Sequence, residues 1–272
     1  MVKKVLLLSS ILVILVYSLY NFNIKNSTNI YLKGTSDIVV PEGFIIKNGT
    51  KNQKIIAITF DDGPHEKFTP QILDILKDND AKATFFVVGN KVEAYPDIVK
   101  RIKEEDHEIG NHTYNHINAE KHNKLKVEDE ILKGQEAVYD ITGTKPTLFR
   151  PPYKGINQNL INIVSDLNLK FVLWCNTVDV RDWSNPGVYS ISNNLLNNIQ
   201  NGDIILLHDY NNREKAPTSQ TVQALRIVLP ELKKRGYKFV TVSQLIKITE
   251  EENKKTKENI KQENKDIKAI NQ

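Results

Sequence analysis

Two neighbouring carboxylates, Asp61 and Asp62, follow the apolar run Ile55–Phe60. Two like charges at the end of a strand repel each other, and a bound metal ion is the usual means of offsetting them. Further along the chain, His112 and His116 offer two imidazoles four positions apart. One carboxylate with two histidines leaves coordination positions open for water and substrate, as a catalytic metal site requires. The second carboxylate is then free to act as a base, so these residues indicate a metal-dependent hydrolase.

Apolar runs and helix signals alternate along the middle of the chain, in about seven βα units. We expect strands at Ile55–Phe60, Ala83–Val88, His107–Gly110, Thr147–Phe149, Phe171–Trp174, Ile204–Leu207 and Lys238–Val240. We expect helices at Pro70–Asp78 with Thr69 as its cap, Pro96–Glu105, Val127–Ile141 ending at Gly143, Asn159–Leu167, Tyr189–Ile199 and Thr218–Lys234. The pattern predicts an α/β fold whose parallel sheet is closed or nearly closed into a barrel. An open doubly wound sheet is the alternative.

Residues able to do chemistry fall just after several of these strands. Asp61 and Asp62 follow the first strand, and His112 and His116 follow the third; Arg150, then Asp179 and Asp182, then His208 follow three later strands. In a βα barrel these strand ends open onto one face, which holds the active site. A histidine pair alone is common on exposed helices, but beside two aspartates on one barrel face it indicates a metal site.

Five segments, taken in order, resemble the motifs of polysaccharide deacetylases, the family of the NodB homology domain (carbohydrate esterase family 4). They are Thr59–Pro64, His112–His116, Arg150–Tyr153, Asp179–Trp183 and Leu206–His208. The resemblance covers roughly Lys54 to Leu245. It implies a distorted (β/α)7 barrel and a divalent metal, usually Zn²⁺ and sometimes Co²⁺. It also implies a hydrolase of carbon–nitrogen bonds other than peptide bonds, which removes acetyl groups from sugar polymers.

The resemblance also assigns roles around the metal. Asp62, His112 and His116 would be the metal ligands, and Asp61 the general base. Arg150 would pair with Asp61 and keep it ionised, because a nearby opposite charge favours the charged form. The backbone N–H of Tyr153 would stabilise the oxyanion of the tetrahedral intermediate.

On the other side of the site, His208 resembles the general acid that protonates the leaving group, with Asp182 as the partner that orients it. Trp183 and Leu206 would wall the acetyl pocket. We expect Thr113 to hold its loop through its hydroxyl, and Asp179 either to support its loop or to contact sugar. His65, His107 and His122 are expected to satisfy loops or face solvent. Lys154 interrupts the Tyr-Gly run common in the family, which affects the shape of the sugar groove.

The chain ends differ from the 53–248 catalytic domain. Lys3 and Lys4 precede the apolar segment Val5–Tyr20, so residues 1–20 are predicted to be a signal anchor or a cleaved signal peptide. Either a signal anchor or a signal peptide would place the catalytic part outside the cytoplasmic membrane. Residues 21–52 are predicted to be a polar tether, with a small strand near Ile38–Val40 before Pro41, and 249–272 a charged flexible tail, because neither contains enough apolar residues to form a core. A frayed helix over part of this tail is the alternative.

Composition excludes several other classes of protein. The 272 residues carry a net charge of +4 from nearly balanced acidic and basic residues, without an Arg-rich stripe, which argues against nucleic acid binding. No glycine pattern for nucleotide binding occurs. Cys175 is the only cysteine, so no internal disulfide forms, and a buried inert thiol is expected. We expect a monomer.

Taken together, the residues favour an extracytoplasmic metal-dependent deacetylase acting on N-acetylglucosamine or N-acetylmuramic acid of peptidoglycan, or on a chitin-like glycan. An O-deacetylase acting on xylan-like polymers would use the same residues. A catalytically silent glycan-binding module is the third alternative, but silent relatives should lack a ligand, Asp61 or His208, and all of them are present.

Overall fold

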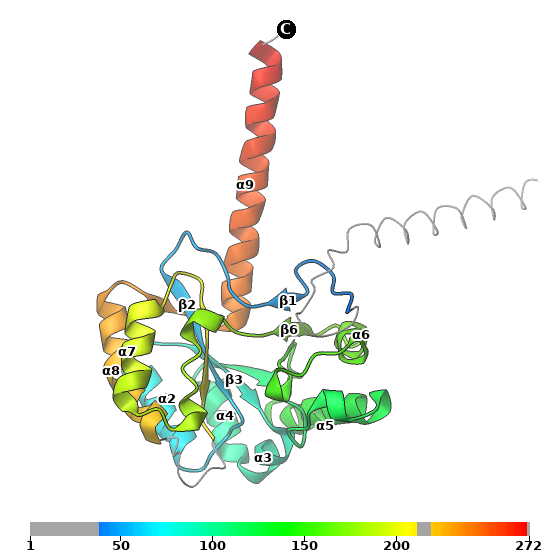
Figure 1. Cartoon of the computed structure of the whole chain (residues 1–272), viewed down its shortest axis with the longest axis vertical. Helices are drawn as coiled ribbons and strands as arrows, with labels where there is room; N and C mark the ends of the chain where they lie inside the picture. Colours follow the sequence, from blue (N-terminus) through cyan, green and yellow to red (C-terminus); the bar gives the residue numbers. More distant parts are fainter. Residues whose placement is uncertain (1–37, 211–218, 271–272) are drawn as a thin grey trace, which may run out of the picture.

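A curled parallel sheet forms the centre of the protein, seen in a computed structural model that describes residues 38–210 and 219–270 (Figure 1). Its strands are β1 (Ile45–Ile46), β2 (Ile55–Asp61), β3 (Ala83–Val87), β4 (Glu108–Asn111), β5 (Leu148–Phe149), β6 (Lys170–Val172) and β7 (Ile204–His208). They are ordered β1-β6-β5-β4-β3-β2-β7, and β8 (Lys238–Phe239) pairs with β2 outside this path. Every pairing between these strands is parallel.

The sheet curls into a half-barrel whose two edges approach each other. The backbone N–H of Cys175, just past β6, donates to Ile204 O of the edge strand β7 at 2.9 Å. Asn48, just past β1, forms an antiparallel bridge with Asp203, just before β7. The prediction of a nearly closed parallel barrel is therefore confirmed, and the open doubly wound sheet is not what the chain forms.

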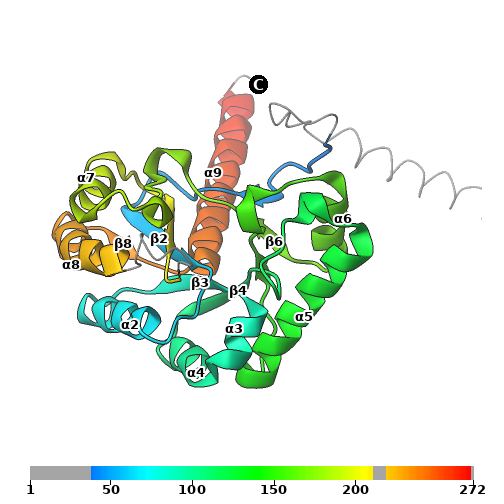
Figure 2. The same cartoon turned by 60° about the horizontal axis from the view of Figure 1, so that its bottom comes forward.

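Helices surround the outside of this sheet (Figure 2). They are α2 (Phe68–Asp78), α3 (Gly89–Ala94), α4 (Pro96–Glu104), α5 (Lys124–Thr142), α6 (Gln158–Asp166), α7 (Val188–Asn198), α8 (Ser219–Lys234) and α9 (Val242–Ile270). The expected helices are present within a few residues of their predicted bounds. Thr69 lies inside α2 and is not its cap, which is Lys67. The predicted start at Thr218 lies outside the described residues.

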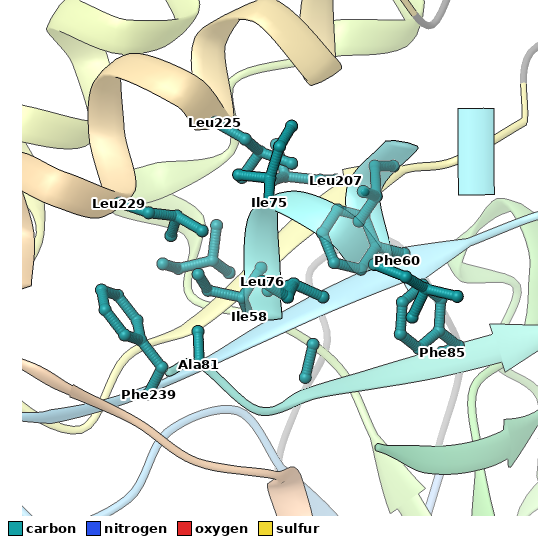
Figure 3. Close-up of a cluster of buried hydrophobic side chains, with 14 of the residues drawn as sticks. Ile58, Phe60, Ile75, Leu76, Ala81, Phe85, Leu207, Leu225, Leu229 and Phe239 are labelled. Carbon is teal, nitrogen blue, oxygen red and sulfur yellow. The ribbon is translucent and has the colours of Figure 1, made fainter. Parts of the chain in front are cut away.

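Alternation along β2 explains why the candidate catalytic residue Asp61 faces the barrel interior. Ile58 and Phe60 pack outward against Ile75, Leu76, Leu225 and Leu229 of α2 and α8, and Phe60 stacks on Phe85 with ring centroids 5.0 Å apart (Figure 3). The intervening residues Ile55 and Ala57 face a second cluster that includes Val242 and Leu245 of α9. Since successive side chains point to opposite faces, Thr59 and Asp61 project to this inner face.

The last part of the predicted tether, residues 38–52, packs against the rest of the domain. Val40 is fully buried, β1 pairs with β6, and the Thr50 backbone N–H donates to Thr249 Oγ1 at 2.9 Å. The tether prediction was therefore wrong for this part, because two-residue β1 is too short to give a sequence pattern. The predicted small strand near Ile38–Val40 is absent, and β1 lies a few residues later.

The C-terminal segment is helical, since α9 extends to Ile270 and projects away from the sheet (Figure 1). Glu252 accepts hydrogen bonds from Thr50, Asn52 and Gln53, which anchor the helix near its middle. Glu250 and Glu251 precede Lys254 and Lys255 by four residues, a spacing that stabilises exposed helices. Low apolar content excluded a core here, but it did not exclude a helix.

Within the two described ranges, none of the helices has the length and apolar character needed to cross a membrane. The predicted signal or anchor, Val5–Tyr20, lies outside the described residues.

Candidate active site

Three side chains converge at the mouth of the half-barrel in the arrangement of a metal site. Asp62 Oδ1 lies 2.9 Å from His116 Nε2 and 3.3 Å from His112 Nε2, and the ligand atoms of all three lie within 4.8 Å of one another. Ligands that bind one zinc ion tetrahedrally at about 2.0–2.1 Å lie about 3.3 Å apart. Asp62 and His116 have positive φ angles of 75° and 55°, which turn their side chains towards this point.

The remaining ring nitrogens of the histidines are occupied in the way a metal site requires. His112 Nδ1 donates to the Arg150 carbonyl oxygen at 2.7 Å, which leaves Nε2 as the unprotonated ligand atom. His116 Nδ1 lies 3.2 Å from the Tyr153 hydroxyl. Burial alone would raise the pKa of Asp62, but hydrogen bonds with His112 and His116 hold this pKa well below its usual value. The donor set therefore fits a divalent metal.

Asp61 has one oxygen fixed and the other turned towards these ligands. Its Oδ1 accepts from Arg150 at 2.6 Å, and its Oδ2 lies 3.9 Å from His112 Nε2. Arg150 is fully buried and also donates to Thr59 Oγ1 at 2.7 Å. Its guanidinium carbon lies 4.0 Å from the ring centroid of Phe86. Burial lowers the pKa of Arg150, and Asp61 opposes this effect. The pair thus fixes the Asp61 carboxyl group inside the barrel.

His208 lies beside Asp61, because the two residues are register partners of β7 and β2. Asp182 accepts from the backbone N–H of His208 at 2.8 Å and lies 2.7 Å from its Nδ1. The Thr221 hydroxyl holds the other face of this carboxylate at 2.7 Å. Burial alone would lower the pKa of His208, but Asp182, supported by Asp62 and Asp61, raises it to about 10. The imidazole is therefore protonated at neutral pH, as a general acid must be.

Removing the charge at position 182 should move the alkaline limit of activity. Asp182→Asn removes the main interaction that raises the pKa of His208, so this pKa falls and the imidazole loses its proton at lower pH. We expect the alkaline limb of the kcat/KM profile to shift to lower pH by at least one unit, with little change on the acid side. The measurement is acetate release as a function of pH. Asp179→Asn is the matched control, and equal shifts in both variants would contradict the pairing.

The predicted pocket residues lie on the strand and loops that carry the site residues. Leu206 is the register partner of Thr59 and lies two residues before His208, so it lies on the inner face with both. Tyr153 and Trp183 have exposed fractions of 67% and 37%, in the loops that follow β5 and β6. Asp179 Oδ1 accepts from the Arg181 backbone N–H at 3.3 Å, which is a loop-supporting contact.

Other histidines lie outside the centre. His65 Nδ1 accepts from the backbone N–H groups of Lys67 and Phe68 at the start of α2. His107 Nδ1 accepts from the Ala83 backbone N–H at 3.2 Å, and His122 is exposed. Cys175 is half-buried rather than fully buried, and it contacts the Thr177 hydroxyl.

Thr113 supports its loop through the backbone and not through its hydroxyl. Its N–H donates to Asn111 Oδ1 at 2.8 Å, and its carbonyl accepts from Gly89 at 3.0 Å. Within the described part of the chain its buried hydroxyl oxygen has no hydrogen-bond partner. The expected hydroxyl contact was therefore wrong. At a φ of 64°, Thr113 supports its loop through its backbone N–H and its carbonyl oxygen instead.

A buried layer behind the metal ligands was missed by the sequence reasoning. Lys91 Nζ donates to the Asp62 backbone carbonyl at 2.7 Å, and burial lowers the pKa of Lys91 to about 8. Asp209 accepts from the Thr69 hydroxyl at 2.6 Å, and burial raises its pKa to about 7. A side chain at Gly63 would overlap the Asp209 carboxylate, so glycine is required there. The position of Asp209 directly after His208 was the one available signal.

Known proteins resemble this chain in sequence and in fold. Residues 48–172 match the family model described as polysaccharide deacetylase. The chain is 47% identical over 207 residues to the peptidoglycan-N-acetylglucosamine deacetylase of Bacillus cereus, covering 76% of this chain and 95% of that protein. It is 38% identical over 196 residues to the chitooligosaccharide deacetylase of Azorhizobium caulinodans, covering 69% and 92%.

A solved structure extends this similarity to the fold. The crystal structure of a peptidoglycan N-acetylglucosamine deacetylase in complex with 4-naphthalen-1-yl-N-oxidanyl-benzamide superposes with a TM-score of 0.70 at 39% identity. The match covers 75% of this chain and 92% of that one. The half-barrel and most of the length of these relatives are therefore shared.

Proposed function

The chain belongs to the polysaccharide deacetylase family, as its motifs predicted, and we propose that it is a metal-dependent N-deacetylase of the cell envelope. Its substrate would be N-acetylglucosamine or N-acetylmuramic acid of peptidoglycan, or a chitin-like glycan. The observation that carries this proposal is the convergence of three metal-ligand side chains with an Arg-paired Asp61 and an Asp-paired His208. The metal would be Zn²⁺ or Co²⁺.

The residues around Asp62 would hold the metal, and the chain supplies the proton transfers. A divalent metal held by Asp62, His112 and His116 would polarise the acetyl carbonyl and lower the pKa of the attacking water. Asp61 accepts the proton of this water through Oδ2, because Oδ1 is bound by Arg150. Attack forms a tetrahedral intermediate, and the Tyr153 backbone N–H would donate to its oxyanion.

His208 completes the reaction from the opposite side. Its protonated imidazole donates a proton to the amide nitrogen as the carbon–nitrogen bond breaks, releasing acetate and a free amine on the sugar. Asp182 keeps the ring oriented and charged before the transfer. Leu206 and Trp183 would enclose the acetyl methyl group, which would favour acetyl over larger acyl groups. Asp179 would support the loop that carries Asp182.

Two observations bear on the alternatives. A silent glycan-binding module has no need for a buried Arg150–Asp61 pair or for the Asp182–His208 pair, and both are fully formed. An O-deacetylase on xylan-like polymers would use the same groups, so a comparison of substrates is needed to distinguish it from an N-deacetylase. The envelope location rests on Val5–Tyr20 and on the cell-wall substrate of the Bacillus cereus relative.

The proposal is tested by the pattern of acetate release. Purified full-length protein is incubated with peptidoglycan, chitin oligomers and acetylated xylan, each with and without added zinc. We expect acetate from the N-acetylated glycans only when the metal is present, and little from xylan. His208→Ala is the control for contaminating esterases. Metal-independent release, or xylan as the best substrate, would contradict the proposed activity.

A further inference from the structure

We propose that Lys154 gives the substrate groove a preference for glycans that carry carboxylate groups. This inference rests on the proposed deacetylase function and narrows its substrate class. Lys154 closes the short 3-10 turn Pro152–Lys154 that follows β5. It is the residue after Tyr153, whose hydroxyl lies 3.2 Å from His116 Nδ1. The two neighbouring side chains therefore diverge, one to the proposed metal ligand His116 and the other to Asn176.

The ammonium group reaches the loop that carries Asp182. Lys154 Nζ donates to Asn176 Oδ1 at 3.1 Å and lies 5.1 Å from the ring centroid of Trp174. Asn176 and Trp174 belong to the segment between β6 and α7, which also contains the partner of His208. Lys154 thus connects the loop of the expected oxyanion donor with the loop that carries Asp182, the partner of His208.

This position is close to the reacting centre. The Trp174 ring centroid lies 5.1 Å from Lys154 Nζ and 5.7 Å from Arg150 Cζ. The two cations are therefore at most about 11 Å apart, and Arg150 contacts the general base directly. A disaccharide spans such a distance, so the ammonium can meet a substituent on the reacting sugar or on its neighbour.

The charge of Lys154 remains available to a ligand. Among the described residues, no carboxylate lies within 4.0 Å of its ammonium group, and its neighbours are the neutral Asn176 amide and the Trp174 ring. An ammonium group has three donors, so two can serve a ligand. By contrast, the Arg150 and Lys91 cations are buried against Asp61 and the Asp62 backbone.

The backbone at this position is strained for a side chain. Tyr153 and Lys154 have consecutive φ angles of 59° and 58°, the left-handed region that glycine adopts without strain. Such conformations are unfavourable for residues that carry a side chain and concentrate at functional sites. Glycine at 154 would relieve this strain, yet the chain places a lysine there. A functional role of the ammonium group would account for a lysine at this position.

Carboxylates distinguish the two main candidate glycans. In peptidoglycan every second sugar carries a lactyl group, and this group or its attached peptide presents carboxylates. Chitin is uncharged. A cation at the groove wall therefore favours peptidoglycan-type strands over chitin. Because Lys154 is exposed, we expect a moderate effect, about 3- to 10-fold in binding or KM.

The test compares variants on matched substrates. Lys154→Met keeps the aliphatic stem, Lys154→Arg keeps the charge, and Lys154→Gly removes both while relieving the strain. Lys77→Met removes a charge from an exposed position of α2 and is the control. The substrates are muropeptide fragments with free carboxylates, the same fragments with amidated carboxylates, and chitin oligomers. Calorimetry gives binding to the full chain, and acetate release gives KM and kcat.

We expect Lys154→Met and Lys154→Gly to weaken binding and raise KM only for the free-carboxylate fragments, with kcat unchanged. Lys154→Arg and Lys77→Met should match the wild type. Lys154→Gly should melt at the same or a higher temperature, which separates this role from a structural one. Equal losses on amidated fragments and chitin, or no loss on any fragment, would overturn the inference. Failure of the wild type to release acetate would count against the proposed function, while the binding measurements still decide the role of Lys154.

Discussion

His112→Ala is expected to abolish acetate release, and so is exhaustive chelation of the wild-type enzyme. Among the described residues, three side chains are placed to bind one metal ion, Asp62, His112 and His116, so the loss of one should leave too few to retain the metal. Metal-assisted polarisation is worth several kcal/mol, and each 1.4 kcal/mol changes the rate about tenfold, so a loss of at least about 10³-fold is expected. Zinc or cobalt should restore the chelated wild type but not the variant.

Metal content and turnover need to be measured on the same preparations. His122→Ala is the matched control, because His122 is an exposed histidine of the same domain and should lose neither metal nor activity. Circular dichroism checks that His112→Ala folds, since His112 is buried and its Nδ1 binds the Arg150 carbonyl. Activity of His112→Ala that persists after chelation would remove the metal from the mechanism.

The sheet could be predicted because its strands are short apolar runs with clear ends. All seven residues of β2 are buried, and the sequence changes from apolar to charged where the strand ends at Asp61. Since parallel strands place these ends at one face, the positions of His112, Arg150 and His208 after other strands were sufficient to predict a common site. The structure places them together there.

The supporting layer could not be predicted, because its contacts involve backbone atoms. Lys91 binds the carbonyl of Asp62, and every residue has a carbonyl, so no residue type marks the partner. Lys91 also lies in α3, a six-residue helix too short to show a periodic pattern. Glu130 accepts from the Asn115 backbone N–H at 2.7 Å and supports the histidine loop from α5. In the sequence it is one of several acidic residues on an amphipathic helix.

Amino-acid composition also failed to predict the structure at the two ends of the domain. The low apolar content of α9 excluded a core there, but helix stability also depends on local charge pairs and on packing of the helix against the rest of the domain. The first turn of α9 supplies this packing, because Val242 and Leu245 lie in one buried cluster with Ile55 and Ala57 of β2. Likewise, β1 forms because β6 offers it a strand edge, which is a tertiary effect.

Asp61→Asn and Asp62→Asn should fail in different ways, although the two residues are adjacent. Asp62 Oδ1 faces both histidines, so the neutral amide should bind the metal more weakly, and excess zinc should restore part of the activity. The backbone should tolerate this change, because asparagine accepts the φ of 75° found at this position. Metal content should fall while the melting temperature of the metal-free protein stays close to that of the wild type.

Asp61→Asn should instead retain the metal and lose about 10²–10⁴-fold in rate, the usual contribution of a general base. Excess zinc cannot restore a missing base. Stability should also fall, because Arg150 is fully buried and loses the carboxylate that offsets its charge, a loss that can reach about 3–5 kcal/mol when a buried pair is broken. Metal analysis, acetate release and thermal denaturation of both variants decide the matter. If Asp61→Asn were the metal-free variant and Asp62→Asn the metallated, inactive one, the roles of the two aspartates would have to be exchanged.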